Sequence, residues 1–149
     1  MTEYSDFVGR EIVTTRVLNA PRDLVFTCFT TPEYLAEWWG PKGFSNTFHT
    51  CDPTPGGMWT FIMHGPDGRE YPNECRFLEV EPPGRIVLEH LGGMHYFLLS
   101  VTLDDFRGKT KVTFRQLFDT AEECAKVKVF AAPANEENMD KLAAILARL

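Results

Sequence analysis

Hydrophobic and polar positions alternate along much of the chain, and this pattern predicts strands. Residues 11–18 are rich in Val, Ile and Thr, which are enriched in strands. In residues 58–64, Trp59, Phe61 and Met63 lie at alternate positions, so one face of this strand is strongly apolar. Between them and after them, further strands are expected at residues 44–51, 71–80, 85–90, 96–103 and 109–118.

Two stretches near the N-terminus show helical spacing instead. The first follows Pro21, and its apolar positions are Leu24, Val25, Cys28 and Phe29. The second begins near Thr31 and ends at the Gly40-Pro41 pair; its apolar positions are Tyr34, Leu35, Trp38 and Trp39. Trp38 and Trp39 are adjacent, so on a helix they point about 100° apart. We expect one ring to pack inward and the other to lie towards solvent or the mouth of a cavity.

The C-terminal part of the chain is also expected to be helical. Thr120 and Glu123 have the spacing of a capping box. A second helical pattern covers residues 135–149, with Met139, Leu142, Ala143 and Leu146 on one face. Pro133 lies between the two patterns, which leaves one kinked helix or two consecutive helices open.

The order of these elements predicts an α+β fold. An antiparallel sheet with one apolar face must bury that face. One terminal helix is too narrow to cover about seven strands. The sheet is therefore expected to curve and grip the long C-terminal helix, with two short helices between the first and second strands. The gap between sheet and helix is a natural ligand cavity.

Composition narrows the class of protein. The 149 residues fit a single domain, 1–149, with its core from about residue 11. The 12 Phe residues indicate a thick core or a lined cavity. The net charge of -6, without a cluster of Lys and Arg, argues against nucleic acid and anionic membranes as partners.

The four cysteines form no CxxC pair, so neither zinc nor a redox site is indicated. The N-terminus lacks an apolar signal-peptide core, and no stretch is apolar for long enough to span a membrane. We expect a cytoplasmic protein with reduced thiols and no cofactor.

Several short patterns occur in order along the chain. They are Trp38-Trp39-Gly40-Pro41 with Phe44, Asp52 followed by Pro55-Gly56-Gly57, Pro66-Asp67-Gly68, and Phe77-Leu78-Glu79-Val80 followed by Pro82-Pro83 and Arg85-Ile86-Val87. In these patterns the chain resembles the family named for the activator of heat shock protein 90 ATPase, in the START/SRPBCC superfamily. The resemblance implies a seven-stranded sheet wrapped around a C-terminal helix, often with an internal cavity. The eukaryotic activator resembles this chain only over its C-terminal domain.

The leading functional hypothesis is a non-enzymatic domain that binds a small hydrophobic molecule, as a monomer or a homodimer. The residues expected to contact this ligand are Trp39, Phe48, Trp59, Phe61, Met63, Phe77, Leu88, His90, Tyr96, Leu98, Phe130, Met139, Leu142 and Leu146. One alternative, implied by the resemblance, is a cochaperone-like regulator of heat shock protein 90 ATPase.

A second alternative is an enzyme like the polyketide cyclases or dehydratases, which share the fold. It would need an acid or base in the cavity, and His90, His95 and Glu74 are the candidates. Glu74 and Arg76 lie on the strand face opposite Cys75 and Phe77, which makes a solvated outer stripe the favoured interpretation. No residue is assigned as catalytic, and no His pair has metal-ligand spacing.

Overall fold

The sheet and the long C-terminal helix account for most of the fold. The computed structural model describes residues 9–92 and 95–149. Its elements follow in the order β1 (Glu11–Leu18), α2 (Arg22–Thr30), α3 (Pro32–Trp38), β2 (Ser45–Cys51), β3 (Met58–His64), β4 (Glu70–Glu81), β5 (Arg85–Gly92), β6 (Phe97–Phe106), β7 (Lys109–Leu117) and α4 (Ala121–Arg148). The predicted α+β architecture is confirmed. Residues 1–8 of the predicted domain lie outside the described residues.

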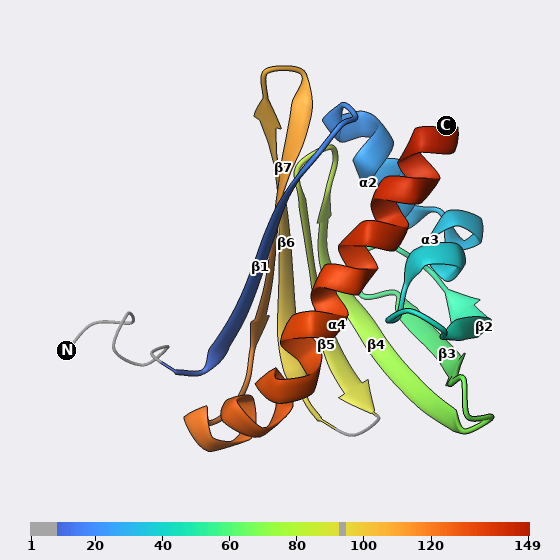
Figure 1. The fold of residues 1–149 in the computed structure, drawn as a ribbon, viewed down its shortest axis with the longest axis vertical. Coiled ribbons are helices and arrows are strands. Elements are labelled where there is room, and N and C mark those ends of the chain that lie inside the picture. The colour runs from blue at the N-terminus through green and yellow to red at the C-terminus, as the bar shows by residue number, and fades with distance from the viewer. Residues whose placement is uncertain (1–8, 93–94) are drawn as a thin grey trace.

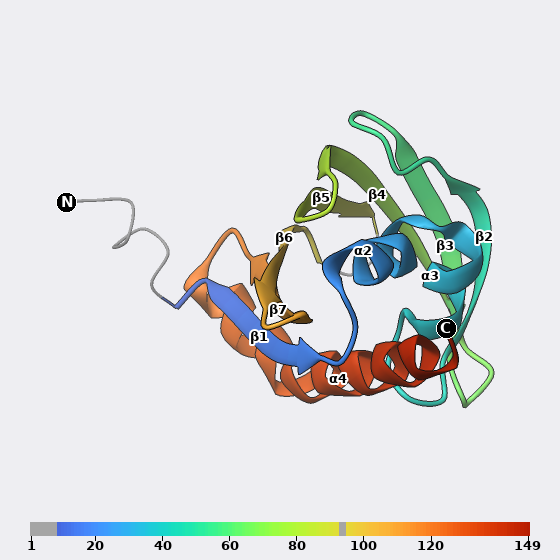
Figure 2. The same ribbon diagram turned by 90° about the horizontal axis from the view of Figure 1, so that it is seen from above.

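The seven strands form one antiparallel sheet in the order β1-β7-β6-β5-β4-β3-β2. Strands β2 to β7 are neighbours in chain order. Strand β1 pairs with β7 at one edge of the sheet, and the segment that contains α2 and α3 connects it to β2 at the opposite edge. Figures 1 and 2 show the sheet curving round α2 and α3, while α4 runs across the open side of the curve.

Helix α4 is continuous through Pro133. Its first turn has the expected cap, since the Thr120 hydroxyl accepts a hydrogen bond from the Glu123 backbone N–H at 3.1 Å. Arg16 on β1 bonds to Glu136 and Asp140 on successive turns of α4, at 2.9 Å each. These ion pairs attach the middle of α4 to the edge of the sheet.

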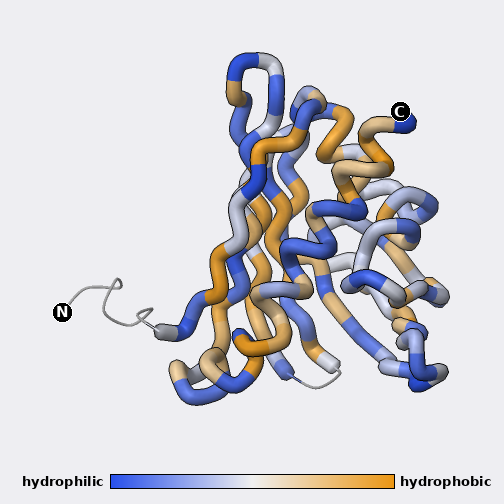
Figure 3. The backbone as a smooth tube through the Cα atoms, in the orientation of Figure 1, coloured by the Kyte–Doolittle hydropathy of each residue, from blue (hydrophilic) through white to orange (hydrophobic). Residues whose placement is uncertain are grey.

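Hydrophobic and hydrophilic residues alternate along the strands (Figure 3), and burial follows this alternation. On β4, Cys75 and Phe77 are buried, whereas Glu74 and Arg76 are exposed. The outer stripe inferred for this pair is confirmed. Arg76 lies 3.4 Å from Glu89 on the neighbouring strand, which is an ordinary surface ion pair.

Two groups of buried side chains contact α4 at different positions along its length. The larger group includes Met139, Leu142 and Ile145 of α4 together with residues of α2 and α3. The smaller group joins Cys124, near the start of α4, to Ile12 and Phe118. The short helices therefore fill the grip around the C-terminal half of α4 and leave its N-terminal half facing the sheet directly.

The four cysteines are free thiols, and three of them are buried. Burial raises the pKa of Cys75 to about 12, with a smaller contribution from the nearby Glu74 carboxylate. Such thiols stay protonated and unreactive at neutral pH. No helix in the described part of the chain is long and apolar enough to cross a membrane.

Candidate ligand-binding site

A cavity of about 660 Å³ lies between the concave face of the sheet and the N-terminal half of α4. Strands β3 to β7 contribute one wall. Helix α4 contributes another, and the segment from Trp39 to Phe44 closes one end. Most of the lining is apolar, and it includes Phe61, Met63, Tyr71, Phe97, Val127 and Ala131. Phe130 also lines the cavity although 76% of its surface is exposed, so it lies at the mouth.

Trp39 separates the cavity from the packed core. Helix α3 ends at Trp38, and Trp39 follows it with an extended backbone. Trp38 is fully buried, and its Nε1–H donates to the Cys28 carbonyl at 2.9 Å. The Trp39 ring is half-buried and meets the Trp59 ring edge-on, with centroids 5.0 Å apart. The expectation that one ring packs inward while the other lies towards the cavity is confirmed, and the two rings remain in edge contact, with centroids 5.6 Å apart.

Gly40 allows this arrangement for two reasons. Its φ is +99°, a conformation that residues with a side chain rarely adopt. A Cβ at this position would also lie 2.8 Å from the terminal methyl group of Met63, which lines the cavity.

Helix α4 also holds the end wall in place. The Lys141 ammonium donates to the carbonyls of Gly40, Pro41 and Phe44 at 3.1, 3.5 and 3.4 Å. One turn earlier, Glu137 accepts a hydrogen bond from the Lys42 backbone N–H at 3.2 Å. Burial lowers the pKa of Lys141, and the Glu137 carboxylate partly opposes this effect.

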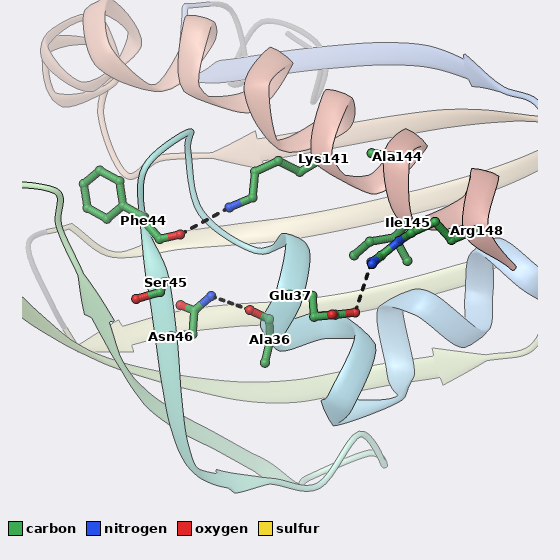
Figure 4. A pocket seen from close by; sticks show the side chains of 9 residues that line it. All are labelled: Ala36, Glu37, Phe44, Ser45, Asn46, Lys141, Ala144, Ile145 and Arg148. Atoms are coloured by element: carbon green, nitrogen blue, oxygen red, sulfur yellow. Dashed lines mark hydrogen bonds and ion pairs between the residues drawn. The ribbon is translucent and has the colours of Figure 1, made fainter.

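Lys141 also belongs to a second, shallower groove of about 520 Å³ between α3, β2 and the C-terminal half of α4 (Figure 4). Glu37 and Arg148 approach each other across this groove at 3.5 Å. Asn46 donates to the Ala36 carbonyl at 3.0 Å. Glu37 and Arg148 are thus paired with each other, and Lys141 is paired with backbone carbonyls.

His90 is a buried polar side chain in the cavity wall. Its Nδ1 lies 2.6 Å from the His95 carbonyl oxygen, and its Nε2 lies 2.6 Å from Oδ1 of Asn73. The ring stacks on Phe97, with centroids 4.8 Å apart. Burial lowers the pKa of His90 below its ordinary value of 6.5, and the hydrogen bond to His95 opposes this shift without outweighing it.

His95 lines the cavity near its mouth and points one nitrogen at a carboxylate. Its Nδ1 is 2.9 Å from Oε1 of Glu123, in the first turn of α4. In the neutral ring, a carboxylate at Nδ1 favours the tautomer with the proton on Nδ1, and the lone pair is then on Nε2. This pair is the arrangement in the cavity that comes nearest to a general base.

Gln116 on β7 is the second buried polar side chain of the wall. Its Oε1 accepts a hydrogen bond from Nδ2 of Asn135 on α4 at 2.8 Å, and both residues are buried. Two cations, Arg69 and Lys126, stand at the rim. Their side chains are 77% and 72% exposed and form ion pairs with Asp67 and Glu122. Their effect on the electrostatic potential inside the cavity is therefore small.

Of the residues expected to contact a ligand, the structure brings five together in the lining: Trp39, Phe61, Met63, His90 and Phe130. Tyr96 is exposed and donates to Glu89 at 2.8 Å, on the outer side of the sheet. The other expected residues lie outside the lining, in or against the packed core or elsewhere on the strands: Phe48, Trp59, Phe77, Leu88, Leu98, Met139, Leu142 and Leu146.

Of the three acid–base candidates, His90 and His95 line the cavity, but Glu74 does not, because it lies on the outer face of the sheet.

Sequence reasoning missed several lining residues, among them Asn73, Phe97, Gln116, Val127 and Ala131. Gln116 had a usable signal, since it continues the inward series Val112 and Phe114 on β7. No group of three or more His, Cys, Asp or Glu side chains in the described ranges could hold a metal ion.

The architecture and the cavity define a helix-grip domain. Residues 19–147 match the model of the family described as "Activator of Hsp90 ATPase homolog 1-like protein" (AHSA1), and the chain belongs to this family. No curated protein matches the chain.

Solved structures with the same fold come from several bacteria. A protein from Arthrobacter aurescens is 22% identical, with a TM-score of 0.88 over 97% of this chain and 90% of that one. A Rhodobacter sphaeroides protein is 25% identical, with a TM-score of 0.86 over 95% of both chains. The AHSA1 protein of Silicibacter pomeroyi is 18% identical, with a TM-score of 0.75 over 93% of this chain and 98% of that chain.

The burial of His90 predicts a pH effect on stability. Because its pKa is lowered in the folded state, the unfolded chain binds the extra proton first as the pH falls below 6.5. The stabilisation is therefore complete above pH 6.5 and is lost as the pH falls through the folded-state pKa. In urea unfolding from pH 8 to pH 5, we expect the free energy of unfolding to fall more steeply for the wild type than for His90→Gln. Parallel curves for the two proteins would contradict this.

Proposed function

We propose that the domain binds a small hydrophobic molecule in the cavity between the sheet and α4. The observation that supports this proposal most directly is the cavity itself, whose volume of about 660 Å³ is within the range of small-molecule sites. Its walls are mainly aromatic and aliphatic, with a few polar side chains, as in sites that bind apolar ligands.

The position of the cavity also supports binding. Phe130 is exposed at the mouth of the cavity. Contact between this side chain and a ligand would remove apolar surface from water, which stabilises the complex. Trp39, Met63 and the segment held by Lys141 form the inner end, so a ligand would meet walls that are already fixed. Preorganised walls favour affinity because little freedom is lost on binding.

A substitution that fills the cavity should abolish binding. Ala131 lines the cavity from α4, and Ala131→Trp places an indole inside it. With 2-isopropylnaphthalene as an apolar probe in equilibrium dialysis, we expect affinity to fall at least about tenfold, or about 1.4 kcal/mol.

Ala144→Trp is the matched control, since the same change on the same helix falls in the other, exposed groove. Its affinity for the probe should equal that of the wild type. Binding that is unchanged in Ala131→Trp, or lost equally in both variants, would count against the cavity as the site. As a separate measurement, native mass spectrometry of detergent-free protein, followed by solvent extraction, identifies a ligand that the protein retains from the host cell.

The pair of His95 and Glu123 favours a second function, acid–base catalysis. With Nδ1–H donated to Glu123, Nε2 of His95 can remove a proton from a carbon next to a carbonyl group. The C–H electron pair then moves to the carbonyl oxygen as an enolate, and the solvent returns a proton to the carbon. This is the type of step that a cyclase or dehydratase requires.

Exchange of hydrogen for deuterium tests this activity without knowledge of the substrate. In D₂O, the protein should speed the deuteration of the acetyl group of 2-acetylnaphthalene, as followed by mass spectrometry. His95→Gln should slow the exchange about a hundredfold, in line with the usual contribution of a general base. Ala144→Trp should leave it unchanged. Equal rates for the wild type and His95→Gln would remove this candidate.

The family description supports a third function, regulation of the ATPase of heat shock protein 90. Under this hypothesis, saturating amounts of the chain change the steady-state rate of ATP hydrolysis by the purified chaperone. An unrelated acidic protein of similar size at the same concentration serves as the control. A rate that does not differ from the control would exclude this function.

A further inference from the structure

We propose that Gln116 makes the cavity selective for apolar ligands that carry a neutral acceptor oxygen, such as a ketone carbonyl. This inference rests on the proposed binding function and specifies the chemistry of the ligand. It starts from a polar side chain that is 7% exposed, lies in an apolar wall and keeps one unused donor group.

The surroundings of Gln116 are apolar along the sheet. Its direct neighbours are Ile12 on β1 and Leu99 on β6, both buried. The preceding inward-facing residue on β7 is Phe114, which is also buried. The side chain of Gln116 is largely shielded from bulk water, and the surface that it keeps faces the cavity.

Only one end of the amide is paired within the protein. Oε1 accepts the hydrogen bond from Asn135, whose own side chain is 5% exposed, so the orientation of the Gln116 amide is fixed. Within residues 9–92 and 95–149, Nε2 of Gln116 donates no hydrogen bond to the protein. Because Gln116 lines the cavity, a bound molecule can supply this acceptor.

His90 shows the contrast. It is the other buried polar side chain of the lining, and each of its ring nitrogens already lies 2.6 Å from a protein oxygen, of His95 and of Asn73, so no ring N–H is left for a ligand. A ligand gains no new hydrogen bond there without displacing one. Gln116 is therefore the buried side chain in the wall that has a donor to offer.

The charges around the cavity favour a neutral oxygen over a carboxylate. Arg69 and Lys126 lie at the exposed rim beside Asp67 and Glu122. No positively charged side chain in the described part of the lining is buried with Gln116. A carboxylate placed against Gln116 would lose its hydration without gaining a counter-charge, whereas a carbonyl oxygen loses much less.

Two probes of nearly equal shape test the inference. The acetyl group of 2-acetylnaphthalene has an acceptor oxygen where 2-isopropylnaphthalene has a methyl group. By equilibrium dialysis, the wild type should bind the ketone about tenfold more tightly, as expected for one buried hydrogen bond. Gln116→Met, which keeps the length of the side chain but has no donor, should bind the two probes about equally.

A double variant controls for the possibility that Gln116→Met lowers stability by leaving Asn135 without its hydrogen-bond partner. Gln116→Leu combined with Asn135→Leu removes both partners of the hydrogen bond together, which leaves no buried polar group unpaired. It should show the same loss of preference as Gln116→Met. Ala144→Trp should keep the preference of the wild type.

The outcomes separate this inference from the function on which it rests. Equal affinities for the two probes in the wild type, or a ketone preference that persists in both Gln116 variants, would overturn the inference alone. If neither probe binds the wild type, the binding function falls and the inference falls with it.

Discussion

The width of the apolar face of the sheet is the constraint on which the rest of the structure depends. Seven antiparallel strands in one sheet present more apolar surface than one helix can cover, so the sheet curves around its contents (Figure 2). Around Leu142 the grip is filled, because α2 and α3 bring Phe29 and Trp38 into the same cluster. Around Val127 and Ala131 no such helix intervenes, and the cavity lies there. The packing of one half of α4 and the cavity along the other half therefore have a common origin.

The boundary between these halves depends on a short segment after α3. The chain leaves the helix at Trp39, turns at Gly40 and is then fastened to α4 through Lys141. The same helix that forms the cavity wall with Ala131 thus holds the end wall two to three turns later. A shift of α4 would change both walls together, so the shape of the cavity is coupled to how firmly the helix is held.

The period of two along the strands was enough to predict the sheet, because most strands have apolar residues on one face only. On β6 it was ambiguous. Tyr96 and Leu98 are apolar, but so are Phe97 and Leu99 on the opposite face, and it is Phe97 that lines the cavity. A change of one residue in the phase of a strand exchanges its faces. Leu88 and Leu146 illustrate a different limit: periodicity shows that a residue points inward, but not whether a neighbouring element fills the space before it. That depends on where α2 and α3 pack, which no local pattern specifies.

The polar pairs in the cavity wall are hard to explain by stability. Gln116 and Asn135 bond to each other in a buried setting, and replacing both by apolar side chains of similar shape is expected to be nearly neutral for folding. The fold therefore does not require an amide at this place. The hydrogen bond instead fixes the orientation of the Gln116 amide, so that its Nε2 group is available to a ligand in the cavity. A wall built only for packing would have no use for that orientation, whereas a wall that selects among apolar molecules needs at least one polar group held in place.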